Sequence, residues 1–131
     1  MSNLNQVMEA ASLLVAAFAA NDTDAYFAAF SEDASFIFHT CEQVLENRAA
    51  YRALWDSWQA EGFRVLECQS LNAQAQLINE NAAIFYHEVR TRVLAGGQNI
   101  SSIERETIIF RREDDGRWLA CHEHLAAAPT T

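Results

Sequence analysis

The second half of the chain most restricts the fold, because its hydrophobic pattern has a period of two over four long segments. These segments cover residues 63–78, 82–94, 100–111 and 116–125, and short turn sequences separate them. Side chains alternate between two faces in a strand, so this period predicts four strands. Tight turns without intervening helices favour an antiparallel meander. Strands of this length exceed the usual ~5–6 residues, so we expect them to twist and coil strongly.

Helical spacing characterises the first half of the chain. Apolar residues recur with the period of a helix and predict three helices, over residues 4–21, 22–30 and 47–62. Asn47 is a favourable residue to begin the third helix, since its side chain can accept from a free amide group. Residues 35–39 are a short β-rich run between the second helix and the third.

Three helices followed by a long antiparallel sheet predict an α+β fold, with residues 1–131 as a single domain. The helices have one apolar stripe each, so we expect them to pack on one face of the sheet. A strongly curved antiparallel sheet packed on N-terminal helices forms a cystatin-like cone, and such a cone encloses a pocket.

Composition excludes several classes of protein. Half of the 131 residues are hydrophobic, the net charge is −9, and every basic residue is arginine. An acidic surface repels phosphate backbones, so we expect no nucleic-acid partner. No segment approaches the ~20 apolar residues of a membrane span, which favours a cytoplasmic protein with no membrane partner. Cys41, Cys68 and Cys121 lack a CxxC spacing, and we expect reduced, buried thiols.

The final strand carries the densest set of ionisable residues. Strict alternation places Trp118, Ala120, His122 and His124 on one face and Glu123 on the other. Two histidines at this spacing can project in parallel and bind one metal ion, with His39 and His87 as further ligands. The alternative is that the imidazoles hydrogen-bond to neighbouring groups. We favour this alternative and expect no metal and no cofactor.

Carboxylates and arginines form a second group on the predicted strands: Glu88, Arg90, Glu104, Glu106 and Glu123. A buried carboxyl group with a raised pKa could serve as general acid or base. Alternatively, these residues form cross-strand Glu–Arg pairs on a solvated or dimer-facing sheet. We favour the second interpretation.

Aromatic residues of the helices are a third group. Tyr26, Trp55 and Trp58 could form the floor of a pocket, where the Tyr26 hydroxyl would polarise a carbonyl group. Aromatic stripes at helical spacing more often belong to the core, and for the tryptophans the core is favoured.

Four segments together resemble a known superfamily. They are residues 16–27 (AAFAANDTDAYF), 48–55 (RAAYRALW), 82–97 and 116–125 (GRWLACHEHL). Their order is similar to that of the nuclear transport factor 2-like superfamily, nearest to its SnoaL-like group and to the association domain of calcium/calmodulin-dependent kinase II. The resemblance implies a curved sheet wrapped around helices, a pocket at the wide end of the cone, and a homodimer packed through the sheet. It implies no single activity, since the superfamily contains isomerases, cyclases, dehydratases, binding modules and oligomerisation domains.

The chain departs from the association-domain pattern at three positions. Glu88, Ile108 and Leu125 stand where the resembling domains have pocket arginines, so we do not expect this pocket to bind carboxylates in that way. Tyr26 stands where those domains place a pocket tyrosine.

Together these features predict a protein with a pocket for a small-molecule ligand. It could be a cofactor-independent isomerase or cyclase that uses Tyr26, Glu88, His122 and His124 in acid–base chemistry. The alternative is a non-catalytic ligand-binding or oligomerisation module. The candidate pocket residues are Tyr26, His39, Trp55, Trp58, Glu88, Arg90, Glu106, His122 and Glu123.

Two arrangements of the last strand remain open. In the first, His122 or His124 lines the main cavity together with Tyr26. In the second, Glu123 faces inward and shares the polar role with Glu88, while the histidines point to the dimer interface.

Overall fold

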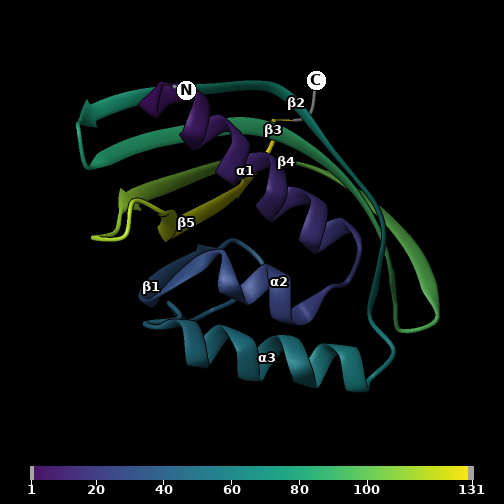
Figure 1. Cartoon of the computed structure of the whole chain (residues 1–131). Helices are drawn as coiled ribbons and strands as arrows, with labels where there is room; N and C mark the ends of the chain where they lie inside the picture. Colours follow the sequence, from purple (N-terminus) through teal and green to yellow (C-terminus); the bar gives the residue numbers. More distant parts are fainter. Residues whose placement is uncertain (1, 130–131) are drawn as a thin grey trace.

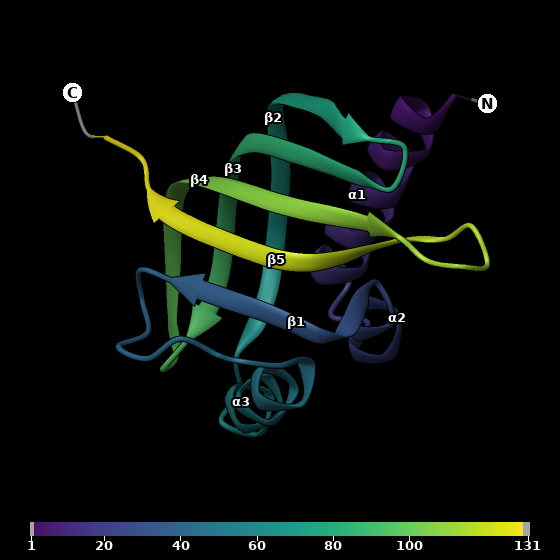
Figure 2. The same ribbon diagram turned by 90° about the vertical axis from the view of Figure 1, so that its left-hand side faces the viewer.

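A five-stranded sheet forms one layer of the structure, and three helices cover one of its faces. The computed structural model describes residues 2–129. The strands follow the order β1-β5-β4-β3-β2, as Figure 2 shows. The elements in chain order are α1 (Asn3–Ala19), α2 (Thr23–Ala28), β1 (Phe30–Phe38), α3 (Arg48–Ala60), β2 (Arg64–Asn79), β3 (Ala82–Ala95), β4 (Gln98–Arg112) and β5 (Trp118–Ala127).

The predicted α+β class and the four-stranded meander are confirmed, with one correction to the sheet. Strands β2 to β5 pair antiparallel with their chain neighbours, but β1 pairs parallel with β5. The sheet is therefore mixed, and the expectation of a wholly antiparallel sheet was wrong at this edge. No other predicted strand is adjacent in sequence to the short run at 35–39, so its pairing partner could not be predicted. Its partner is the last strand, which comes much later in the chain.

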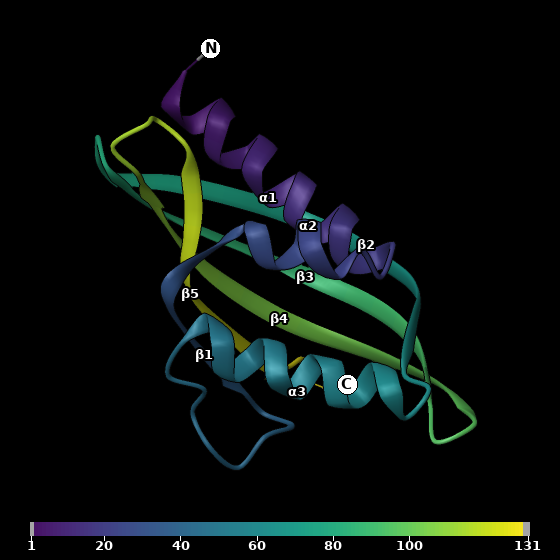
Figure 3. The same cartoon turned by 60° about the horizontal axis from the view of Figure 1, so that its bottom comes forward.

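The helices lie on the same side of the sheet, which curls over them (Figures 1 and 3). Val7, Ala11 and Leu14 form the buried stripe of α1, which packs mainly on β2. Helix α3 lies beside β1, and its stripe buries Tyr51 and Trp55. We call the helix-covered face of the sheet the inner face and the opposite one the outer face.

Local signals explain where the third helix begins and ends. The side chain of Asn47 accepts a hydrogen bond from the Ala50 amide at 2.8 Å, as expected for an N-cap. Gly62 follows the helix with φ of +100°, a conformation that other residues rarely adopt, so the chain can turn into β2.

A cluster of aromatic side chains from α2, β1 and α3 forms the core next to the sheet. Trp55 is fully buried and its indole Nε1 donates to the Thr23 hydroxyl at 2.9 Å. Tyr51 packs edge-to-face against Trp55 and against Tyr26, and Tyr26 packs in the same way against Phe30, an arrangement that aromatic rings favour. This packing fixes the two short helical segments against the sheet.

A bulge in β5 changes the face on which the last side chains lie. Ile109 and Phe110 are consecutive in β4, but they pair with His122 and Ala120, which leaves Cys121 as an extra residue. An extra residue in one strand reverses the alternation beyond it. Trp118 and Ala120 therefore share the inner face with Glu123, not with the histidines.

The sequence predicts that no segment of the chain spans a membrane. No helix in the described part of the chain has the length and apolar character needed to cross a membrane. The cytoplasmic location and the absence of a nucleic-acid partner stay predictions.

Asn21 offers a test of how the helical half is joined to the sheet. This residue has φ of 55°, and its side chain makes two hydrogen bonds to the Val65 backbone, at 2.9 and 2.8 Å. We expect Asn21→Ala to lower the free energy of unfolding by about 2–4 kcal/mol, because it loses both bonds and strains the backbone. Urea unfolding measures the effect.

The control is Asn21→Gly, which loses the same two bonds but accepts the positive φ. It should cost about 1 kcal/mol less than the alanine variant. Equal stability of Asn21→Ala and the wild type would contradict this account of the junction.

Candidate functional site

A cavity of about 360 Å³ lies between the inner face of the sheet and the helices. Phe18, Phe38, Trp58 and Phe63 are among its apolar and aromatic walls. The charged groups in its lining are all acidic: Glu61, Glu104, Glu106 and Glu123. Within residues 2–129, no arginine, lysine or histidine lines this cavity. An apolar chamber with a few convergent polar groups is the usual form of a small-molecule site.

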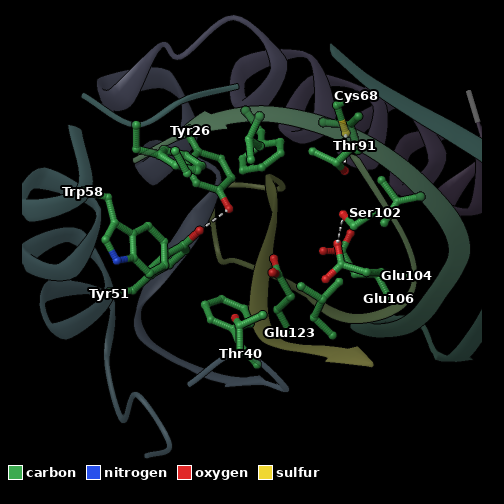
Figure 4. A pocket seen from close by; sticks show the side chains of 18 of the residues that line it. Tyr26, Thr40, Tyr51, Trp58, Cys68, Thr91, Ser102, Glu104, Glu106 and Glu123 are labelled. Atoms are coloured by element: carbon green, nitrogen blue, oxygen red, sulfur yellow. Dashed lines mark hydrogen bonds between the residues drawn. The ribbon is translucent and has the colours of Figure 1, made fainter. Parts of the chain in front are cut away.

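A pair of tyrosines occupies one side of the cavity (Figure 4). The hydroxyl oxygens of Tyr26 and Tyr51 lie 2.8 Å apart, so one hydroxyl donates to the other. Burial raises the pKa of both phenols well above the ordinary value, and the nearby carboxyl of Glu123 raises it further. Both phenols therefore stay protonated at neutral pH, and the pair retains one O–H that can donate to a ligand.

Two glutamates of β4 point into the cavity across from the tyrosines, and each is held by a histidine. His39 Nε2 lies 2.6 Å from Glu104 Oε2, and His87 Nε2 lies 2.7 Å from Glu106 Oε1. The other ring nitrogen of His87 lies 2.6 Å from the Ser70 hydroxyl. His87 is directly opposite Glu106 in the β3–β4 ladder, so the strand register itself sets this contact.

Glu123 is the third carboxyl group, and it has no such partner. Figure 4 shows it on β5 between the tyrosine pair and the two glutamates of β4. It is 3 % exposed, and its strand neighbours Phe36 and Ile108 are fully buried. Among the described residues, Glu123 Oε1 is the buried side-chain polar atom without a hydrogen-bond partner.

The surroundings of Glu123 favour its neutral form. Burial raises the pKa of its carboxyl group well above the usual value. The charge of Glu106, a hydrogen bond shared with the Glu106 carboxyl group and the charge of Glu104 raise this pKa further. Removing water from an ion costs much more than removing it from a neutral acid, and like charges nearby add to that cost. Glu123 therefore holds a proton inside the cavity at a pH where an exposed glutamate is ionised.

Some of the residues predicted for the site lie together in the lining of the cavity, and the others lie elsewhere. Tyr26, Trp58, Glu106 and Glu123 line the cavity. Trp55 is a core residue, in line with the favoured alternative. His39 contacts Glu104 but is not itself part of the lining.

The expectation that His122 or His124 lines the cavity was wrong. The bulge at Cys121 turns both to the outer face, where His122 Nδ1 lies 2.8 Å from the Ser35 hydroxyl. Burial and the neighbouring His124 lower the pKa of His122. The alternative arrangement, with Glu123 facing inward, is the one observed.

Glu88 and Arg90 were also wrongly assigned to the pocket. Both lie on the outer face of β3, since His87, Val89 and Thr91 occupy its buried positions. The alternation of β3 was predicted correctly, but the face that the helices cover was not. The buried set carries the more apolar side chains of the strand, and this difference was a usable signal.

Three functional side chains were missed in the pocket assignment. Tyr51 was interpreted only as part of a helical stripe, and Glu104 only as one of a group of charges. His87 was considered only as a metal ligand, whereas it holds Glu106. Among the described residues, no His, Cys, Asp or Glu cluster of three is arranged to hold a metal ion. The absence of a metal and of a cofactor stays a prediction.

The cysteines are free and half-buried, so the expectation of fully buried thiols holds only in part. Cys68 lines the cavity, and burial raises the pKa of its thiol to about 11. A thiol with such a pKa is a poor nucleophile at neutral pH, because the thiolate is the reactive form.

Comparison with known families agrees with this geometry. A SnoaL-like domain model matches residues 7–130. The chain belongs to the SnoaL-like domain family. A search of curated proteins found no match.

Solved structures similar to this SnoaL-like chain share its fold at low sequence identity. A ketosteroid isomerase-like protein from Erwinia carotovora atroseptica has a TM-score of 0.87 at 12% identity, covering 98% of both chains. A putative calcium/calmodulin-dependent protein kinase II association domain from Xanthomonas campestris has 0.81 at 14%, covering 100% of this chain and 91% of the other.

A nuclear transport factor 2-like protein with a cystatin-like fold, from Novosphingobium aromaticivorans, has a TM-score of 0.73 at 18% identity, covering 97% of this chain and 82% of the other. Together with the family match, these likenesses confirm the predicted superfamily and the cystatin-like fold.

The raised pKa of Glu123 predicts how stability depends on pH. The folded protein binds this proton more tightly than the unfolded chain does, so unfolding releases it between the ordinary value of 4.5 and the higher folded value. The stabilising contribution of this proton is present below this pH range and is lost as the pH rises through it. We expect Glu123→Gln, which keeps the shape and stays neutral, to reduce that loss.

Thermal unfolding from about pH 5 to about pH 8 measures the effect. The melting temperature of Glu123→Gln should exceed that of the wild type at the upper end, and the difference should shrink toward the lower end. Glu88→Gln, on the outer face, is the control and should follow the wild type. Parallel profiles for wild type and Glu123→Gln would show that Glu123 is ionised normally.

Proposed function

We propose that the cavity binds a small, largely apolar molecule and exchanges protons with it, as in cofactor-independent isomerisation or cyclisation. The observation that carries this proposal is Glu123, a buried carboxyl group in the cavity that is clear of any arginine. Structural carboxylates in a sheet are normally paired with a base, whereas a carboxyl group in a cavity with a perturbed pKa and no basic partner is typical of acid–base sites.

The two central carboxyl groups have complementary roles in this proposal. Glu106, next to His87, is the proton acceptor, and Glu123 is the proton donor. The two groups are chemically identical, but their environments in the protein differ. This difference allows Glu106 to act as a base and Glu123 as an acid. The hydroxyl of Tyr26 or Tyr51 donates to an oxygen that gains charge during the transfer.

The comparisons support both the proposal and its alternative. A ketosteroid isomerase-like protein is among the similar structures, which fits acid–base chemistry on a small molecule. An association domain is among them as well, which fits a non-catalytic binding or oligomerisation module. Glu123 favours the first, since a buried carboxyl group without a basic partner is costly and a scaffold does not require one.

Deuterium exchange distinguishes catalysis from binding. Native mass spectrometry of the purified protein first identifies a co-purified small molecule, which is then incubated with protein in D₂O and followed by NMR. We expect the wild type to introduce deuterium at a carbon of the ligand. Glu106→Gln should slow the exchange about a hundredfold or more, because general-base catalysis typically contributes that much.

Tyr26→Phe should slow the same exchange by a smaller factor, since Tyr51 retains a hydroxyl at this side of the cavity. Glu88→Gln is the control with an unchanged rate. A ligand that binds but keeps its hydrogens in the wild type would favour the non-catalytic alternative.

We also propose that the chain forms a homodimer through the outer face of the sheet. Tyr86 and Ile103 lie on this face and are 47% and 48% exposed, and helices cover only the opposite face. A second copy would bury this surface in an isologous interface. We expect a dimer in light scattering at tens of micromolar protein.

A double variant Tyr86→Glu, Ile103→Glu should shift this dimer to monomer, because it places charge in an apolar contact. Leu13→Glu is the matched control, since Leu13 is 64% exposed but lies on α1, away from the sheet's outer face. A wild-type monomer, or dimer loss caused by Leu13→Glu alone, would refute the proposed interface.

A further inference from the structure

Glu61 in the cavity lining is exposed to solvent. Apart from Glu61, the cavity holds one more acidic group than it has bases to match. Glu104 is paired with His39 and Glu106 with His87, but the third carboxyl group, Glu123, contacts no basic side chain. Even with both imidazoles charged, ionised Glu123 would leave one uncompensated negative charge in a buried space. A proton on Glu123 removes that charge. A ligand that brings a positive charge can replace this proton.

The rest of the lining restricts what kind of cation fits. Phe18, Phe38, Trp58 and Phe63 surround the carboxyl groups with apolar and aromatic surface. Such walls do not hydrate a small inorganic ion, and the described acidic and histidine side chains are not arranged as a metal cluster. Aromatic faces do attract organic ammonium groups, and they also pack against an apolar body. A volume of about 360 Å³ accommodates a molecule of modest size.

We propose that the ligand of this cavity is a small organic molecule with a basic nitrogen, which is protonated in the site and pairs with the carboxylate of Glu123 while its apolar part packs against the aromatic walls. This inference rests on the proposed function and names the substrate class of that site. The positive charge of the nitrogen takes the place of the proton that Glu123 holds without a ligand.

The pairing of the ligand nitrogen with Glu123 determines whether binding releases a proton to solvent. If the free ligand is an ammonium ion, Glu123 gives up its O–H proton to solvent, and the N–H of the ligand donates to the resulting carboxylate. If the free ligand is the neutral amine, the same proton moves from the carboxyl oxygen to the nitrogen, and none is released. The terminal torsion of a glutamate is broad, so Oε1 can turn toward the nitrogen.

Other titratable groups face Glu123 and set the background for this exchange. They are Glu104 and Glu106 on β4, Tyr26 on α2, Tyr51 on α3 and Cys68 on β2. His39 after β1 and His87 on β3 contact Glu104 and Glu106 in turn. The tyrosines and Cys68 have raised pKa values and stay protonated at neutral pH. The contribution of Glu123 must therefore be isolated by mutation of Glu123 itself.

Benzylammonium, benzyl alcohol and benzoate share the same ring and differ in charge. Comparing their binding therefore separates the effect of ligand charge from the effect of ligand shape. Isothermal titration at about pH 7, in two buffers with different ionisation enthalpies, gives both the affinity and the number of protons released. We expect benzylammonium to bind about tenfold or more tightly than benzyl alcohol, with net release of protons to solvent, and benzoate not to bind.

Variants assign the effect to one carboxyl group. Glu123→Gln should abolish the proton release and weaken benzylammonium binding about tenfold or more, while leaving benzyl alcohol binding nearly unchanged. Glu88→Gln, on the outer face, should behave as the wild type. Circular dichroism checks that each variant is folded, and the proton release of the wild type is informative without any variant.

The outcomes separate this inference from the proposed function. Benzyl alcohol binding as tightly as benzylammonium, without proton release, would overturn the cationic ligand class but leave small-molecule binding in the cavity intact. Proton release that persists in Glu123→Gln would also overturn it, since another group would then pair with the cation. Failure of all three probes to bind the wild type would overturn both proposals.

Discussion

The burial of Glu123 without a basic partner is the constraint on which the rest of the cavity depends. Its neighbours in the sheet are Phe36 and Ile108, so water cannot solvate its charge, and Glu106 opposes that charge directly. The carboxyl group is consequently kept neutral, and the two glutamates of β4 are each held by a histidine. Carboxyl groups in different environments thus lie side by side, which is the arrangement that proton transfer requires.

This arrangement depends on a single extra residue in the last strand. With Cys121 accommodated in a bulge, Glu123 follows Ala120 onto the inner face. Without the bulge, strict alternation would place His122 and His124 in the cavity and Glu123 outside. Bulges are frequent next to functional sites because they redirect side chains in this way. The chemistry of the cavity is therefore set by backbone register as much as by the identity of the residues.

The sequence was sufficient to predict the fold but not to predict which side chains face the cavity, and the reasons are physical. Period-two and helical spacing, together with signals such as Asn47 and Gly62, report local geometry, so the helices and the four long strands could be predicted. The parallel pairing of β1 with β5 is a non-local contact that no spacing encodes. The bulge at Cys121 leaves no trace in an alternating pattern, and it reversed the assignment of His122 and Glu123. Glu88 was misplaced because alternation defines two faces without saying which one the helices cover.

The protonation state of Glu123 is the central claim, and it can be measured directly. Side-chain ¹³C NMR of protein labelled at the glutamate carboxyl carbons follows each carboxyl group with pH, and the Glu123→Gln variant identifies the signal. The account predicts a titration midpoint for Glu123 well above the ordinary value of 4.5. A midpoint at or below that value would contradict it, because Glu123 would then be an ordinary carboxylate with no proton to exchange.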